Sequence, residues 1–345
     1  MVHKQKIFIK TYGCQANIND SEIMAALFSR KYQIADSENS ADIIFINSCA
    51  VKNKTQSKIL DYIKKHKDKK IIVGGCLVKT LDIKKQFPKV KTIDTINLQR
   101  LGKELIRNKK NIAIIQISQG CMNNCTYCAT RLAKGKLKSY PIKKIKLELK
   151  KAVDEEIKTI YITSQDNGCY GKDTETNLVE LLRELIKVER DYKIRIGMSN
   201  PQYVVKYLDE LLSVMENKKI IKFLHIPVQS GSNKVLKDMK RGHSSEDFVI
   251  IVNKFRKKFP RQKFPDSTIA TDIIVGYPTE TEDDFQKTLN LIKNTKPEVL
   301  NISAFSSRAG TPASRLKQLS SEIIKQRTKK LNDIYREYRK ELKGS

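Results

Sequence analysis

The 345-residue sequence has no tryptophan, only four histidines and far fewer acidic than basic residues. No apolar run approaches the roughly 18 residues that a membrane-spanning helix needs. The first residues, MVHKQKIFIKTYGC, lack the apolar segment of a secretory signal. With 39% apolar residues, the chain can build sizeable cores, which excludes wholesale disorder. The sequence therefore predicts a folded, cytoplasmic protein that does not enter a membrane.

Lysine and arginine number 67 against 38 aspartates and glutamates, which gives a formal net charge of +29. An excess of this size indicates a polyanionic partner, with nucleic acid favoured over an anionic membrane surface. The alternative is a lysine-rich surface without a dedicated partner.

Apolar β-branched segments alternate with amphipathic helical segments along the chain, which predicts an α/β fold of parallel βαβ units. We expect an N-terminal parallel-sheet domain over residues 1–105, a second domain over 111–310 and a helical tail over 311–345. The second domain has room for six βα units, which favours a partial (β/α)6 barrel over the complete eightfold barrel. The expected strands are 6–10, 42–47, 70–73 and 91–95, then 112–118, 159–163, 193–198, 221–228, 267–275 and 297–304.

Three of the seven cysteines, Cys121, Cys125 and Cys128, form C-x3-C-x2-C directly after an expected strand. An odd number of cysteines, three of them within eight residues, suits no ordinary disulfide framework. Structural zinc sites usually have four ligands in paired spacings, and no histidine lies nearby in the sequence. Three thiolates can hold three irons of a [4Fe–4S] cluster and leave the fourth iron open. The motif therefore favours an iron–sulfur cluster over zinc.

Cys14, Cys49 and Cys76 each follow an expected strand of the first domain. Neighbouring parallel strands end at one edge of a sheet, so we expect these thiols to converge on a second metal site. The alternative is three buried core cysteines. Cys169, the seventh, is interpreted as a packing residue.

The cysteine motif, with Tyr127 before its last cysteine, resembles that of the radical S-adenosylmethionine (SAM) enzymes. TYGCQANINDSE, NSCAVKNKTQSK and VGGC resemble the N-terminal domain of the methylthiotransferases. TSQDNGCYG, LHIPVQSGS, MKRGH and TDIIVGYPTETEDDF resemble their radical domain. RLAKGKLKSYP most resembles the archaeal and eukaryotic branch, which modifies N6-threonylcarbamoyladenosine next to the tRNA anticodon. The resemblance covers essentially the whole chain.

This resemblance implies a tRNA methylthiotransferase that acts at position 37 with SAM and two [4Fe–4S] clusters. Cys121, Cys125 and Cys128 would hold the cluster that cleaves SAM to a 5′-deoxyadenosyl radical. Cys14, Cys49 and Cys76 would hold an auxiliary cluster that carries the transferred sulfur. Carried over by motif, the expected SAM contacts are Tyr127, Gln165, Asp166, Asn167, Ser199, His225 and Gln229.

The expected partners are the tRNA anticodon arm and an electron donor such as ferredoxin or flavodoxin, and the chain is expected to be a monomer. Basic side chains would contact the RNA phosphates. The candidates are Arg131, Lys134, Lys136, Lys138 and Arg308. Relatives usually carry a C-terminal TRAM β-barrel, for which this sequence leaves no room.

Two other enzymatic functions remain open within the same family: methylthiolation of isopentenyladenosine in tRNA and of an aspartate in a ribosomal protein. An alternative of another class is an iron–sulfur protein that binds RNA without catalysis.

Overall fold

The computed structural model describes residues 4–50, 53–95, 98, 104–107 and 111–344. The chain forms two compact units. The first comprises Met1–Cys121 and Ala129–Gln165, and the second comprises Met122–Cys128 and Asp166–Ser345. The limits expected from the sequence, 105 and 111, enclose residues that lie mostly outside the described part, so those limits remain predictions.

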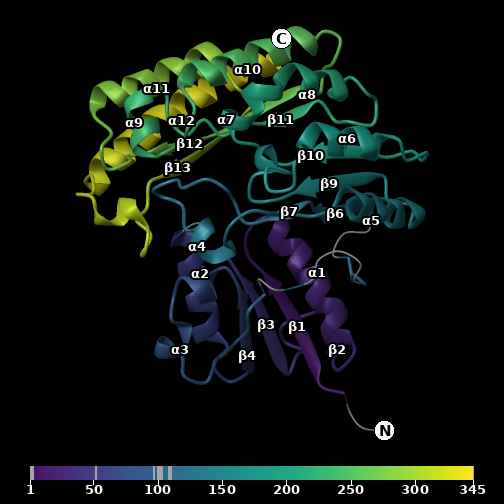
Figure 1. The fold of residues 1–345 in the computed structure, drawn as a ribbon. Helices are drawn as coiled ribbons and strands as arrows, with labels where there is room; N and C mark the ends of the chain where they lie inside the picture. Colours follow the sequence, from purple (N-terminus) through teal and green to yellow (C-terminus); the bar gives the residue numbers. More distant parts are fainter. Residues whose placement is uncertain (1–3, 51–52, 96–97, 99–103, 108–110, 345) are drawn as a thin grey trace. The chain divides into compact units, whose positions relative to one another are not determined.

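The first unit contains a five-stranded parallel sheet in the order β2-β1-β3-β4-β5 (Figure 1). The central strand β3 is buried at every position, which is why its sequence IIFINS is continuously apolar over its first four residues. Its bounds and those of its neighbours are β1 (Lys6–Thr11), β2 (Gln33–Ile34), β3 (Ile43–Ser48), β4 (Lys70–Gly75) and β5 (Lys91–Thr92). The expected parallel sheet is confirmed.

Helices cover both faces of this sheet. Along β3, Ile43 and Phe45 pack in the cluster that contains Met24 of α1 (Gln15–Ser29). Ile44 and Ile46 face the other way, toward α2 (Asn53–Lys65). The two-residue alternation of a strand thus divides β3 between two cores. A short helix, α3 (Ile83–Gln86), precedes β5.

The α1 helix begins at residue 15 and is buried along most of its length. It contacts β1, β3 and also β6 (Ile112–Gln116), where the Asn19 side chain donates to the Ile114 carbonyl at 3.0 Å. The remaining elements of this unit are β7 (Ser118–Gln119), α4 (Thr130–Lys134), β8 (Lys138–Ser139), α5 (Ile142–Asp154) and β9 (Thr159–Thr163).

The second unit alternates strands and helices, as the sequence predicted. Strands β11, β12 and β13 pair in parallel, and β10 is linked to them by a parallel bridge between Ile194 and Ile220. The strands are β10 (Lys193–Ile196), β11 (Phe223–His225), β12 (Thr268–Val275) and β13 (Val299–Ala304). The helices are α6 (Leu178–Ile186), α7 (Pro201–Val204), α8 (Leu208–Met215), α9 (Asn233–Asp238), α10 (Ser245–Lys258), α11 (Glu282–Thr295) and α12 (Ser321–Gly344).

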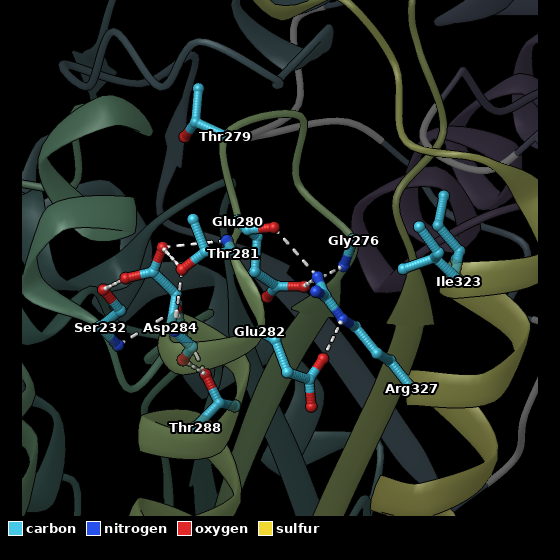
Figure 2. A network of polar contacts seen from close by, with 12 residues as sticks. Ser232, Gly276, Thr279, Glu280, Thr281, Glu282, Asp284, Thr288, Ile323 and Arg327 are labelled. Carbon is cyan, nitrogen blue, oxygen red and sulfur yellow. Dashed lines mark hydrogen bonds and ion pairs between the residues drawn. The ribbon is translucent and has the colours of Figure 1, made fainter.

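The expected helical tail is α12, which packs on β13 and α11. Figure 2 shows how it fixes the turn after β12. Arg327 of α12 donates to the Glu280 carboxylate at 2.9 Å, and that carboxylate also accepts the Gly276 N–H at 2.8 Å. Gly276 has φ +80°, and a Cβ there would lie 2.5 Å from Ile324. The close approach of α12 therefore requires glycine at this turn. No helix in the described chain is both long and apolar enough to cross a membrane.

Candidate cluster and cofactor sites

The three strand-end cysteines of the first unit lie at one edge of its sheet. Cys49 and Cys76 follow the paired strand ends Ser48 and Gly75, and the Cys76 N–H donates to the Ser48 carbonyl at 2.9 Å. Cys14 follows β1, the other neighbour of β3, and is the N-cap residue of α1. The parallel register therefore places the three cysteine-bearing strand ends at one edge, while their convergence on a metal site stays a prediction.

Hydrogen bonds hold the backbone around these thiols. Asn17 donates to the Ser48 carbonyl at 2.9 Å and to the Tyr12 carbonyl at 3.0 Å, and it accepts a bond from the Cys14 thiol at 3.7 Å. A Cβ on Gly13 would lie 3.0 Å from the Cys49 Cβ, so the loops of Cys14 and Cys49 touch here. Cys14 is exposed, whereas Cys49 and Cys76 are buried. One side of the site is therefore open to solvent.

The pKa of the Cys76 thiol is raised to about 12, mainly by burial; Lys134 opposes this rise, and the nearby Cys14 and Cys49 contribute to it. Thiols in this setting ionise readily only when a positive charge is supplied. A metal cluster supplies that charge, and the donor set of three thiols with no disulfide among the seven described cysteines fits such a group.

Lys134 does not lie where the sequence suggested. It was expected on an RNA-facing loop, but it ends α4 with 3% of its surface exposed. Its ammonium lies 2.9 Å from the carboxylate of Asp20, which is itself fully buried in α1. A charge held in this way is not available to an RNA phosphate. Lys134 instead lies near the thiol of Cys76, whose pKa it lowers. Lys136 and Lys138 are exposed and Arg131 is half-buried.

Gln165 supports the backbone that leads to Cys121. Its side-chain oxygen accepts the Gly120 N–H at 2.7 Å, and Gly120 adopts φ +75°. The next N–H, that of Cys121, donates to the Gly135 carbonyl at 3.3 Å. Gln165 was expected to contact SAM. That role stays a prediction; within the first unit its side chain contacts the cysteine loop.

In the second unit, Cys125 and Cys128 lie on a turn anchored by Thr126. The Thr126 backbone bonds to Met239 at 3.1 Å and Ala313 at 2.9 Å, and its hydroxyl lies 2.9 Å from that of Tyr277. Tyr127 packs against the apolar cluster that contains Tyr277 and Met239. The backbone of the turn that carries Cys125 and Cys128 is therefore held in place by protein contacts alone.

Asp166 ties three loops of the second unit together. Its carboxylate accepts bonds from the Gly168 N–H at 2.9 Å, the Asn200 N–H at 3.0 Å and the Asn123 side chain at 2.8 Å. Burial raises the pKa of Asp166, opposed by these bonds and by Arg241. Asp166 thus joins these loops beside the cysteine turn, and its expected contact with SAM stays a prediction. Asn167, next to it, is buried and donates its N–H to the Met198 carbonyl at 2.9 Å.

In the second unit, three buried polar atoms near the strand ends have no hydrogen-bond partner among the described residues: Asn200 Nδ2, Gln229 Oε1 and Arg241 Nε. Gln229 also adopts φ +76°, a conformation that non-glycine residues seldom take and that is often found at functional sites. Buried polar atoms left in this state indicate a polar ligand, and the amino acid and ribose parts of SAM offer matching groups. Ser199 is buried beside them, and its N–H donates to the carbonyl of half-buried His225, whose ring lies 3.0 Å from Asp272.

Arg241 was not singled out from the sequence, although it lies in the MKRGH segment. Its side chain is 6% exposed and reaches Cys125 and Tyr127. The MKRGH segment itself was the available signal, but the sequence does not show that its arginine is buried or what the arginine faces. Arg308, expected to contact RNA, is also largely buried. Cys169 is buried and donates to the Asp166 carbonyl at 3.2 Å, consistent with a packing residue.

Comparison with known proteins identifies the family. Residues 115–292 match the radical SAM superfamily, and residues 6–96 match an uncharacterized protein family, UPF0004. A probable threonylcarbamoyladenosine tRNA methylthiotransferase from Archaeoglobus fulgidus is 40% identical over 96% of this chain and 83% of its own length. The threonylcarbamoyladenosine tRNA methylthiotransferase of Homo sapiens is 38% identical over 97% of this chain and 63% of its own length.

Solved structures show the same fold at low sequence identity. The radical SAM methyltransferase TsrM from Kitasatospora setae superposes with a TM-score of 0.61 at 12% identity, over 90% of this chain and 75% of TsrM. The cobalamin-dependent SAM radical enzyme OxsB gives 0.55 at 13% identity, over 97% of this chain and 56% of OxsB. These matches confirm the expected α/β fold class. The chain therefore belongs to the radical SAM superfamily and, within it, to the family of threonylcarbamoyladenosine tRNA methylthiotransferases.

Proposed function

We propose that this chain converts N6-threonylcarbamoyladenosine at position 37 of tRNA, next to the anticodon, to its 2-methylthio derivative. The observation that carries the proposal is the second set of cysteines, at the ends of β1, β3 and β4, in addition to the C-x3-C-x2-C motif. A radical SAM enzyme needs one cluster to cleave SAM, whereas the insertion of sulfur also needs a site that carries sulfur. The second set of three thiols would provide the site that carries sulfur.

Superfamily membership implies SAM and one [4Fe–4S] cluster, which Cys121, Cys125 and Cys128 would hold. Cys14, Cys49 and Cys76 would hold the second. When bound, these groups supply the electron that cleaves SAM and the sulfur that is transferred. Radical chemistry suits this reaction because carbon 2 of adenine offers neither an acidic proton nor a leaving group.

The chain's own residues bind and orient these groups. Asn17 fixes the Cys14 loop through the Ser48 carbonyl, and Gln165 fixes Gly120 before Cys121. In the second unit, Asp166 holds Asn123 and the Asn200 backbone in place. The free polar atoms of Asn200 and Gln229 are then available to SAM. Tyr127, Asn167, Ser199 and His225 complete the proposed SAM contacts.

The proposed RNA contacts follow from charge and exposure. Lys136 and Lys138 are exposed and Arg131 is half-buried on the segment after the cysteine motif, so they suit the phosphates of the anticodon arm. An electron donor such as ferredoxin or flavodoxin, a monomeric state and a cytoplasmic location complete the proposal.

The function is tested by removing each set of cysteines separately. Anaerobically reconstituted protein should bind about eight irons, because two three-cysteine sites each support a four-iron cluster. Replacing Cys14, Cys49 and Cys76 with alanine should leave about four irons and SAM cleavage, but abolish methylthio transfer. Replacing Cys121, Cys125 and Cys128 should abolish 5′-deoxyadenosine formation.

The readouts are iron content, 5′-deoxyadenosine and nucleoside mass spectrometry of tRNA. Methylthiolation at the native rate without Cys14, Cys49 and Cys76 would refute the sulfur-carrying role. Parallel assays with tRNA that carries isopentenyladenosine and with a ribosomal protein separate the alternative substrates.

A further inference from the structure

We propose that Arg241 is a positioning residue of the cysteine turn, and that its guanidinium raises the reduction potential of the cluster that Cys125 helps to hold. This inference rests on the proposed function, which assigns Cys125 to the radical cluster. It concerns a residue outside the cysteine motif.

The Arg241 side chain spans from the cysteine turn to the end of β11. One terminal nitrogen, Nη1, lies 3.5 Å from the Cys125 sulfur and 3.4 Å from the Tyr127 hydroxyl. The other, Nη2, donates to the Pro227 carbonyl at 2.9 Å. All of these residues belong to the second unit. The planar guanidinium is thus held at one end by backbone, with its other end toward the sulfur.

The backbone of Arg241 is fixed as well. The residues on either side, Lys240 and Gly242, have φ +55° and +69°, and the Arg241 N–H donates to the Leu236 carbonyl at 3.0 Å. This turn ends α9 and leaves the side chain 6% exposed. Its position is therefore set by the fold before a cluster binds.

The charge of Arg241 has no carboxylate counter-ion within ion-pair distance among the described residues, and its Nε has no hydrogen-bond partner. Arg327, another buried arginine of the same unit, is different, because Glu280 and Glu282 pair with it at 2.9 and 3.1 Å. A buried cation is costly unless it is compensated. The Cys125 sulfur, as a thiolate of a cluster, is the anionic acceptor that its geometry offers.

A cationic donor beside a ligating sulfur favours the more negative, reduced state of a cluster. Uptake of one electron takes a [4Fe–4S] cluster from its 2+ to its 1+ state, and hydrogen bonds to sulfur and net charge are among the factors that set its potential. The interaction is strengthened by burial, where electrostatic effects are poorly screened. Removing the guanidinium should therefore make the cluster harder to reduce.

The test measures the midpoint potential of the cluster by redox titration followed by electron paramagnetic resonance. It uses the full chain with Cys14, Cys49 and Cys76 replaced by alanine, so that only one cluster contributes to the signal. Arg241→Met and Arg241→Gln should shift the potential to more negative values while about four irons remain bound. Arg256→Met is the matched control. Arg256 pairs with Glu298 at 3.0 Å in the same unit, so its loss should leave the potential unchanged.

A wild-type potential in the iron-loaded neutral variants would overturn the proposal. If neither neutral variant retains iron, Arg241→Lys carries the test, because it keeps a positive charge at this position while losing the fork of the guanidinium. That variant should retain about four irons and a potential close to that of the parent. Loss of iron, or a potential far below that of the parent, would show that the charge at this position does not act on the cluster. Absence of any cluster in the parent protein would instead refute the proposed function itself, so the two failures are distinguishable.

Discussion

At the scale of single residues, the cations that face inward differ in role from the many that cover the surface. Lys134 lies against Asp20, and Arg327 lies against Glu280, in each case with both partners buried. Breaking such a pair by removing one partner leaves an uncompensated charge in a medium of low polarity. The position of these cations therefore contributes to stability as well as to the sites.

The Lys134–Asp20 pair gives a direct prediction. Lys134→Met should lower the free energy of unfolding by about 3–5 kcal/mol, because the buried Asp20 carboxylate loses its counter-ion. Combining it with Asp20→Leu should restore most of that loss. Chemical denaturation measures both. Lys136→Met, at an exposed position two residues away, is the control and should change stability by less than about 0.5 kcal/mol. Equal effects of Lys134→Met and Lys136→Met would contradict the buried pair.

His243 predicts a pH dependence. Burial, followed by the charge of Arg241, lowers the pKa of His243 to about 4. The unfolded chain takes up this proton near pH 6.5 but the folded chain does so only near pH 4, so the stabilisation is complete above pH 6.5 and is lost on acidification toward pH 4. His243→Gln should remove up to about 2 kcal/mol of the stability difference between pH 7.5 and pH 5. Denaturation of both proteins at the two pH values measures this difference, and parallel losses would exclude the histidine as its source.

At the scale of elements, α12 fixes the turn between β12 and α11 (Figure 2). Arg327 binds the side chain and the carbonyl of Glu280, and Thr281 and Asp284 form a capping box at the start of α11. The same turn carries Tyr277, whose hydroxyl contacts Thr126 between Cys125 and Tyr127. A continuous set of contacts thus runs from the C-terminal helix to the cysteine turn within one unit.

Loosening α12 should be detectable at a distance along this unit. Arg327→Met should destabilise the protein by about 3 kcal/mol and speed amide hydrogen exchange over residues 276–282, because Glu280 loses its cation. Lys325→Met, at an exposed position of the same helix, is the control. If exchange over 276–282 is unchanged in Arg327→Met, α12 does not hold the turn.

At the scale of the whole molecule, the net charge of +29 predicts that tRNA binding depends steeply on salt. Each phosphate contact contributes a log–log slope of roughly −0.7 to −0.9, through release of condensed counter-ions. Replacing Arg131, Lys136 and Lys138 with alanine should flatten the slope by up to about 3 units and weaken binding to all tRNAs similarly. Lys134 is left in place because its charge is buried.

Filter binding over a salt series provides the measurement. The control variant replaces three exposed lysines of the same unit, Lys143, Lys150 and Lys158, and so removes the same net charge. Equal slopes in the two variants would indicate that total charge, rather than the segment after the cysteine motif, determines binding. In either case SAM cleavage without tRNA should persist, because the cluster cysteines are unchanged.

Much of this organisation is determined by sequence that is local along the chain. The alternation of apolar strands and amphipathic helices predicted the α/β class and the parallel sheet, because the period of a strand or helix depends on neighbouring residues. The edge shared by Cys14, Cys49 and Cys76 followed from the same rule, since parallel strands end together. The spacing of Cys121, Cys125 and Cys128 is likewise a property of one short segment.

Only the tertiary structure decided which charged side chains face inward. Lys134 and Lys136 are near neighbours in a basic segment, but α4 turns the first toward Asp20, 114 residues away in the sequence. Arg241 and Arg308 read as ordinary basic residues until the fold encloses them. The physical reason is that residues distant in the sequence decide whether a charged side chain is buried against a partner or exposed at the surface. The local periodicity of the sequence does not contain that information.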